Sequence, residues 1–201
     1  MIDGVIKYNF DFHLSEPLDD RLLLKLESLR EKLFSLELIG VTDEGIGFGN
    51  ISQRIDKNSF IITGTQTGHL STLDAKHYSL IEVYDDKEFY LKSSGAIKPS
   101  SEALTHGTIY NLSSEIGGVI HIHSKEVWNF MLKNDYLKTK NVEYGSIEMI
   151  DEVNRLFNQI DPLSNPKFVM AGHEDGVMVF GSDLLSAEST LYRILGKMLH
   201  S

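Results

Sequence analysis

Two histidines spaced two positions apart, His121 and His123, are the residues that first indicate chemistry. They lie in the otherwise apolar stretch 118–123, which predicts a β-strand. Because side chains alternate between the two faces of a strand, both imidazoles would share one face, a few ångströms apart. Two neutral imidazoles on one face suit zinc, cobalt or iron. The alternative is that both histidines simply occupy a solvated strand face.

A carboxylate and a third histidine stand in segments that could meet this pair. Glu102 and His106 are four positions apart at the start of a predicted helix, and therefore lie on one helical face. His173 follows a second apolar stretch and lies between Gly172 and Gly176, which permit a tight turn. The pattern favours three histidines and one acidic side chain converging on a single ion.

Composition limits the classes of partner and the residue types that could bind a metal. The chain has 201 residues, which predicts one domain over residues 1–201, and its formal net charge is −10. This charge repels nucleic acid and anionic membranes, so we expect neither as a partner. A small anionic substrate then needs a local positive centre, which a bound cation supplies. Since there is no cysteine, a transition-metal site must use His, Asp and Glu.

The sequence contains no recognisable targeting or membrane segment. Its N-terminus lacks the basic start and apolar block of a signal peptide. No apolar run reaches the roughly 20 residues that span a bilayer. We therefore expect a cytoplasmic protein.

Hydrophobic periodicity and turn signals predict the elements that must position these residues. Leucines spaced alternately by four and three from Leu22 to Leu36 predict a first helix that Gly40 can end. Glycine-dense or polar loops are expected at 45–52 and 64–68. Further helices are expected at about 100–112, 125–132, 147–160 and 186–199, and strands at 60–63, 81–84, 88–91, 118–123, 168–171 and 177–180. Interleaved helices and strands indicate an α/β fold, with a mixed sheet covered by helices on both faces.

Three short motifs are spread over the chain. They are Gly49-Asn50-Ile51-Ser52, then Lys98-Pro99-Ser100-Ser101-Glu102, and Val119-Ile120-His121-Ile122-His123-Ser124 about twenty residues later. Together they resemble the class II aldolase/adducin family, in its first glycine–asparagine loop, its Pro-Ser-Ser-Glu helix start and its His-Thr-His-Ser strand. Ile122 replaces the common threonine. The resemblance runs from about Asn50 to the final helix, which is most of the chain.

The resemblance implies a single-domain, three-layer α/β/α fold with a mixed, mainly antiparallel central sheet. Family members commonly form cyclic homotetramers with active sites at subunit interfaces, so we expect a homotetramer. Family enzymes include sugar-phosphate aldolases, an epimerase and a dehydratase. The implied function is a metal-dependent lyase that cleaves a small, phosphorylated hydroxyketone or sugar through a metal-stabilised enediolate.

By the same resemblance, His121, His123 and His173 are metal ligands, and zinc or another divalent transition metal is the cofactor. Glu102 is implied to bind the resting ion and to leave it as the general base when substrate binds. Three neutral imidazoles leave the full positive charge on the ion. The ion can then hold the hydroxyl and carbonyl oxygens of a hydroxyketone and stabilise the enediolate.

The resemblance also assigns a phosphate pocket to Asn50, Thr67, Gly68, Ser100 and Ser101. Hydroxyl groups and free amides at a helix N-terminus suit an anion. The alternative for the two serines is simple N-capping of the helix.

Tyr144 and His106 receive supporting roles. Tyr144 lies near the position where family aldolases place a catalytic tyrosine that a neighbouring subunit donates, which predicts a general acid. Simple packing is the alternative for this ring. His106 is expected to support the site by a hydrogen bond rather than to bind the ion.

Two departures from the family pattern affect the substrate. Glu174 and Asp175 stand where glycine usually follows the third histidine directly, which either reshapes the pocket or leaves two solvated loop acids. The loop 64–68 is also two residues longer than the usual form. A dehydratase or an epimerase are alternatives, although related epimerases tend to carry aspartate in place of Glu102. A non-catalytic interaction module, as in adducins, is a further alternative, against which the filled ligand positions argue.

Overall fold

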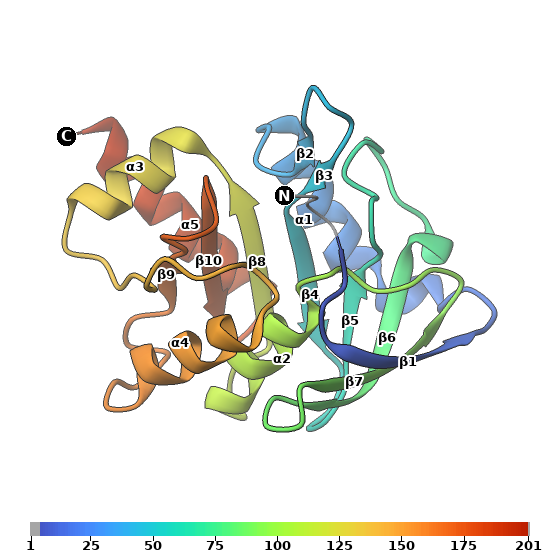
Figure 1. Ribbon diagram of the computed structural model, residues 1–201. Coiled ribbons are helices and arrows are strands. Elements are labelled where there is room, and N and C mark those ends of the chain that lie inside the picture. Colours follow the sequence, from blue (N-terminus) through green and yellow to red (C-terminus); the bar gives the residue numbers. More distant parts are fainter. Residues whose placement is uncertain (1–4, 201) are drawn as a thin grey trace.

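The computed structural model describes residues 5–200, so residues 1–4 and 201 of the predicted domain lie outside the described part of the chain. Its centre is a sheet of eight strands in the order β1-β7-β6-β5-β4-β8-β10-β9 (Figure 1). The strands are β1 Asn9–Leu14, β4 Asn50–Arg54, β5 Phe60–Thr63, β6 Tyr78–Asp85, β7 Tyr90–Gly95, β8 Gly118–His123, β9 Lys167–Val169 and β10 Gly176–Gly181. A two-stranded ribbon pairs β2 Gly40–Val41 with β3 Gly47–Phe48.

Five α-helices and two short 3₁₀ helices accompany the strands. They are α1 Leu24–Ser35, α2 Ala103–Leu112, α3 Lys125–Lys133, α4 Ile147–Phe157, α5 Leu184–Leu199, η1 Asp20–Leu22 and η2 Ala75–His77. None of the helices in the described part of the chain combines the length and the apolar character that crossing a membrane requires.

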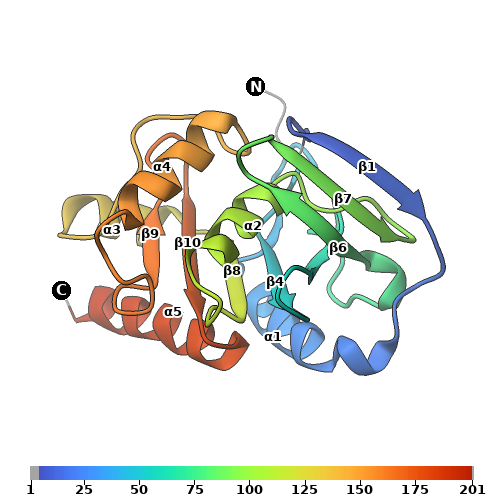
Figure 2. The same cartoon turned by 90° about the horizontal axis from the view of Figure 1, so that it is seen from below.

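The sheet is mixed and mainly antiparallel, as expected. Only the edge pair β1–β7 is parallel; the other strand pairs in the eight-stranded sheet are antiparallel. Both faces are covered, with α1 and α5 along one side and α2 and α4 along the other (Figure 2). The predicted three-layer α/β/α architecture is therefore confirmed.

Each face of the sheet carries its own apolar core, because neighbouring strand residues point in opposite directions. In β8, Ile120 and Ile122 join the core beneath α1, α3 and α5. Val119 joins the opposite core, which includes Leu104 of α2 and Val153 of α4. His121 and His123 share the side of Val119, so the period-two prediction places them on the face that α2 and α4 cover.

The leucine stripe forms a helix, but its ends differ from the prediction. Leu26, Leu29 and Leu33 are buried in α1, whereas Leu22 and Leu36 lie outside the helix and are exposed. The helix ends at Ser35 without help from a glycine, and Glu37 takes a positive φ of 57°. Gly40 belongs to β2, so the prediction that it ends the helix is wrong.

Other elements differ from the prediction in their bounds, and one strand was not predicted. The expected loop 45–52 contains β3 and the first residues of β4, and β6 and β7 extend beyond the predicted hairpin. The strand β1 was not predicted, although Phe10, Phe12 and Leu14 alternate with polar residues as in a half-exposed strand. Helix α4 ends at Phe157, three residues before the predicted end, and α5 begins two residues early.

Candidate metal centre

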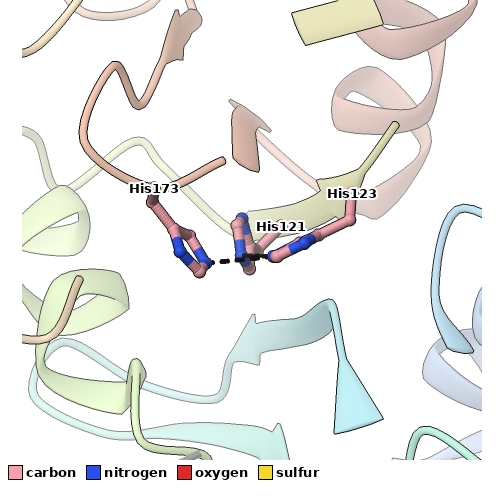
Figure 3. A group of neighbouring side chains, drawn as sticks. All are labelled: His121, His123 and His173. Carbon is pink, nitrogen blue, oxygen red and sulfur yellow. Dashed lines mark hydrogen bonds between the residues drawn. The ribbon is translucent and has the colours of Figure 1, made fainter. Parts of the chain in front are cut away.

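Three histidine side chains point toward one another at one end of β8 (Figure 3). The Nε2 atom of His123 lies 3.1 Å from Nε2 of His121 and 3.0 Å from Nε2 of His173. Tetrahedral zinc with Zn–N bonds of about 2.05 Å holds its nitrogen ligands about 3.3 Å apart. Nε2 of His123 therefore lies from both other nitrogens at nearly the separation that one shared ion imposes, and ligand atoms of all three histidines lie within 4.8 Å of one another.

Strand pairing brings the third histidine to the other two. β10 runs antiparallel to β8, with Gly176 opposite His123, and His173 lies in the turn just before β10. Both flanking glycines are needed for this approach. A Cβ on Gly172 would lie 2.2 Å from the carbonyl oxygen of Val142, and one on Gly176 would lie 2.7 Å from Cδ2 of His173.

The protonation state of the histidines suits metal binding. Nδ1 of His121 lies 3.2 Å from the carbonyl oxygen of Val177, which can only accept, so Nδ1 carries the hydrogen and Nε2 keeps its lone pair. Burial, together with the neighbouring His123 and His173, holds the pKa of His121 well below its usual value. Burial and the charge of Lys7 lower the pKa of His173 to about 4. Both rings are neutral at pH 7.

Glu102 brings a carboxylate to the same point. Its Oε2 lies 3.1 Å from Nε2 of His121 and its Oε1 lies 3.5 Å from Nε2 of His173, and the residue is only 3% exposed. The sequence predicted Glu102 within the first turn of the helix, whereas it is the N-cap residue directly before α2. A buried carboxylate beside three imidazoles forms a donor set for a divalent cation, so the residues present fit the implied metal.

The predicted substrate residues lie around this donor set. Asn50, Thr67, Gly68, Ser100 and Ser101 line one pocket together with the three histidines and Glu102. Asn50 is buried opposite His121 on β4, and its Oδ1 has no hydrogen-bond partner among the described residues. An unpaired buried amide that lines a pocket is suited to contact a ligand.

Ser100 and Ser101 both line the pocket, and Ser100 also makes a capping hydrogen bond. The Oγ of Ser100 accepts a hydrogen bond from the backbone N–H of Glu102 at 3.3 Å, as a capping side chain does. The N-cap position itself belongs to Glu102, so the predicted N-cap position of the serine is wrong by two residues. Both serines nevertheless line the pocket, at the N-terminal end of α2.

Two further pocket residues were not singled out from the sequence. The ring of Phe48 stacks on His123 at 5.3 Å between centroids, and Gln66 accepts a hydrogen bond from the N–H of Gly47 at 3.1 Å. Both lie in loops whose glycine content was noticed. The signal that could have found Phe48 is a large apolar residue between two glycines, where a loop usually carries a polar one.

Tyr144 lies against the histidine of its own chain. Its ring is 4.8 Å from the ring of His173, and the residue is 4% exposed. The Nζ of Lys7 lies 3.6 Å above the Tyr144 ring and donates to its carbonyl oxygen at 2.7 Å. Within one chain, Tyr144 therefore contacts a predicted metal ligand.

His106 supports the site differently from the prediction. Its Nδ1 lies 2.7 Å from Oγ of Ser52, which in turn lies 2.8 Å from the hydroxyl of Tyr110. Ser52 is on β4, opposite Val119 of β8, so this buried chain of polar groups braces the strand beside the metal ligands. His106 is therefore hydrogen-bonded to Ser52 of the neighbouring strand β4, and not to one of the predicted metal-binding residues.

The two acids after His173 do not line the pocket of the histidines. Glu174 is exposed, as expected for a solvated loop acid. Asp175 adopts a positive φ of 65° and its carbonyl oxygen accepts a hydrogen bond from the N–H of Ser124 at 3.0 Å. Asp175 therefore shapes the turn between β9 and β10 and ties it to Ser124, the N-cap residue of α3.

The buried histidines lead to a pH-dependent stability of the metal-free protein. Burial lowers the pKa of His106 to about 3 and that of His173 to about 4, both below the ordinary 6.5. Between pH 6.5 and these lowered values, the unfolded chain binds protons that the folded protein does not. The contribution of each histidine to the free energy of unfolding is therefore present above pH 6.5 and is lost as the pH falls. Each such group contributes up to about 1.4 kcal/mol per pH unit.

Urea unfolding of chelator-treated protein at several pH values between 7.5 and 4.5 measures this slope. His106→Asn should reduce it, whereas His13→Asn, at an exposed position, should leave it unchanged. A free energy of unfolding that stays constant down to pH 5 contradicts the expectation.

Comparisons with known proteins agree with this geometry. The family model described as class II aldolase and adducin N-terminal domain matches residues 43–194. The 3-oxo-tetronate 4-phosphate decarboxylase of Haemophilus influenzae is 26% identical over 158 residues, which cover 70% of each chain. The residues that the family model matches include Glu102 and the three histidines.

Solved structures share the fold. An L-fuculose 1-phosphate aldolase superposes with a TM-score of 0.67 at 18% identity, over 92% of this chain and 88% of the other. A sugar-phosphate aldolase from Thermotoga maritima gives a TM-score of 0.66 at 16% identity, over 90% and 94%. The family model covers more than half of the chain, and the chain therefore belongs to the class II aldolase and adducin family.

Proposed function

We propose that this protein is a divalent-metal-dependent lyase, with zinc as the first candidate ion, that breaks a carbon–carbon bond in a small phosphorylated hydroxyketone or sugar. The observation that carries the proposal is the donor set. Three Nε2 atoms and the carboxylate of Glu102 meet at one point of a pocket that also contains hydroxyl and amide groups.

Each group has a defined task in such a cleavage. A divalent ion bound by this set would polarise the carbonyl and hydroxyl oxygens of the substrate. The electron pair of the broken carbon–carbon bond stays on the carbonyl fragment, and Glu102 delivers a proton to that carbon. In the reverse direction Glu102 removes the same proton. In that reverse direction Tyr144, beside His173, is the general acid that donates its phenol proton to the carbonyl oxygen as it becomes a hydroxyl group, and cleavage returns this proton to the phenolate.

Decarboxylation is a second candidate, which the relative from Haemophilus influenzae favours. A 3-oxo acid that loses carbon dioxide leaves its electron pair beside a carbonyl, as aldol cleavage does. The same ion and the same proton donor therefore serve both reactions. An epimerase and a dehydratase are further alternatives, and the complete donor set speaks against a non-catalytic, adducin-like module.

Two assays on metal-loaded protein separate these candidates. L-fuculose 1-phosphate and related sugar phosphates report aldehyde release, and 3-oxo-tetronate 4-phosphate reports release of carbon dioxide. Turnover in one assay selects the reaction. If neither reaction occurs with zinc, cobalt or manganese, and gently purified protein contains no stoichiometric metal, the enzymatic proposal is wrong and the interaction module is favoured.

The phosphate pocket predicts a specific loss of substrate affinity. Replacing Asn50 or Ser101 with alanine should raise KM for a phosphorylated substrate about tenfold or more, because a hydrogen bond to a charged group contributes about 1.5–3 kcal/mol. Metal content should not change. Steady-state kinetics with phosphorylated and unphosphorylated substrates measures the effect. Ser189→Ala, at a half-buried position of α5 outside the pocket, is the control. An equal rise in KM for both substrates contradicts a phosphate role.

We also propose that the protein is a cytoplasmic homotetramer with active sites near subunit interfaces, acting on a small anionic molecule. The net charge of −10 supports the exclusion of nucleic acid and anionic membranes as partners. Sedimentation velocity tests the assembly, and a monomer at micromolar concentration contradicts it.

A further inference from the structure

Arg30 is a buried cation that is hydrogen-bonded to the loop 67–71, part of which lines the pocket. It lies in the middle of α1 and is only 1% exposed. Its Nη2 donates to the carbonyl oxygens of Thr67 and Gly68 at 3.1 and 3.2 Å, and its Nη1 donates to the carbonyl oxygen of Ser71 at 2.9 Å. One guanidinium group therefore fixes three carbonyls of a single loop.

Arg30 forms no ion pair with a carboxylate among the described residues, although the charge of the neighbouring Glu31 acts on it. Among residues 5–200, no carboxylate lies within 4 Å of its nitrogens, and its hydrogen bonds go to these three carbonyls. Burial lowers the pKa of Arg30, but a guanidinium stays protonated in proteins. A buried charge without a counterion is costly, and carbonyl dipoles compensate it only in part. An anion in the adjacent pocket would complete the compensation.

Peptide geometry links Arg30 to the pocket. In a trans peptide the N–H points away from the C=O, so the carbonyls of Thr67 and Gly68 that face Arg30 direct the N–H groups of Gly68 and His69 the opposite way. Thr67 and Gly68 line the pocket, and Arg30 does not. The loop therefore turns its acceptors toward Arg30 and its donors away from it.

The loop has little freedom to adopt another arrangement. A Cβ on Gly68 would lie 1.9 Å from the carbonyl oxygen of Gly40, so the backbone is pressed against β2 at this point. The hydroxyl of Thr67 also donates to the carbonyl oxygen of Gly64 at 2.9 Å, which closes the loop on itself. Such a preformed set of donors binds an anion without first having to be ordered.

We propose that Arg30 is a positioning residue for anion recognition: it orients the 67–71 loop toward the pocket and places a positive charge behind it, so that the pocket selects a phosphate group. This inference rests on the proposed phosphate pocket. It adds a residue from outside that pocket, from a helix that precedes the three motifs in the sequence.

Calorimetric titrations of the metal-loaded, full-length protein with two small probes test the proposal. Inorganic phosphate reports the anion pocket, and acetohydroxamate reports the metal centre. Arg30→Met, which keeps the length of the side chain without its charge, should weaken phosphate binding at least tenfold and leave hydroxamate binding unchanged. Arg30→Lys keeps the charge but not the planar fork, and should weaken phosphate binding to a smaller extent.

Lys25→Met is the matched control, because it removes one positive charge from an exposed position of the same helix. It should leave both titrations unchanged. If Arg30→Met does not fold, the Arg30→Lys titration decides in its place.

Equal phosphate affinity in the Arg30 variants and the unmodified protein overturns the proposal. So does a parallel loss of phosphate and hydroxamate binding, which would make Arg30 a general structural residue. If the unmodified protein binds hydroxamate but not phosphate, the phosphate pocket itself is wrong, and the role of Arg30 is wrong with it. The failure of the phosphate pocket is seen in the unmodified protein, whereas the failure of the Arg30 proposal is seen only in the variants, so the two failures can be told apart.

Discussion

Replacing His123 with alanine is expected to strip the protein of its metal. Nε2 of His123 lies 3.1 Å from Nε2 of His121 and 3.0 Å from Nε2 of His173, so removing its side chain would leave only two imidazoles to hold the ion. Removing groups that merely orient metal ligands costs 10–100-fold in affinity, so loss of a ligand should cost at least about 100-fold. Competition with a fluorescent zinc chelator measures the dissociation constant directly.

His123 is a better choice than His121 for this experiment. It is half-buried, whereas His121 is buried completely, so its removal disturbs the fold less. His13→Ala, on the exposed edge strand β1, should retain full affinity for zinc. If His123→Ala keeps stoichiometric zinc at unchanged affinity, the three histidines do not form a metal site.

Replacing Glu102 with glutamine is expected to keep the ion and abolish proton transfer. The amide has the same shape as the carboxylate and retains one oxygen toward His121 and His173, which lie 3.1 and 3.5 Å away. It cannot accept or deliver the proton, and loss of a general acid–base group lowers rates by about 10²–10⁴-fold. The measurements are kcat for cleavage and the incorporation of solvent deuterium at the product carbon.

Glu126→Gln provides the control, because Glu126 is an exposed acid in the first turn of α3, close in sequence to His123. It should leave both measurements unchanged. Retained turnover in the Glu102→Gln protein, with deuterium still incorporated, would refute the assignment of Glu102 as the base.

Local periodicity was sufficient to predict part of the site. The alternation of strand residues puts His121 and His123 on one face wherever the strand goes, because the two side chains are only two peptide units apart. Glycines on both sides of His173 also marked a turn, and the structure shows that Val142 and His173 itself leave no room for a side chain at those positions.

Other parts depended on contacts between distant segments. Glu102 and His106 were placed together on one helical face, yet Glu102 precedes α2 and reaches the histidines, while His106 is hydrogen-bonded to Ser52 of β4. Arg30 stands between Leu29 and Leu33 in the first helix, where the sequence suggested only core packing. Its partners are about 40 residues away in the chain and meet it only in the folded protein.

The sequence by itself determined which side chains are available for chemistry, the family, and the layered α/β architecture, because residue type and short-range periodicity act within a few neighbouring residues. Only the tertiary structure decided that His173 meets the other two histidines, that Tyr144 approaches them from the same chain, and that Arg30 lies behind the pocket loop. The reason is physical. Distances between segments are set by strand order and by the packing of helices on the sheet, and these depend on the whole chain at once.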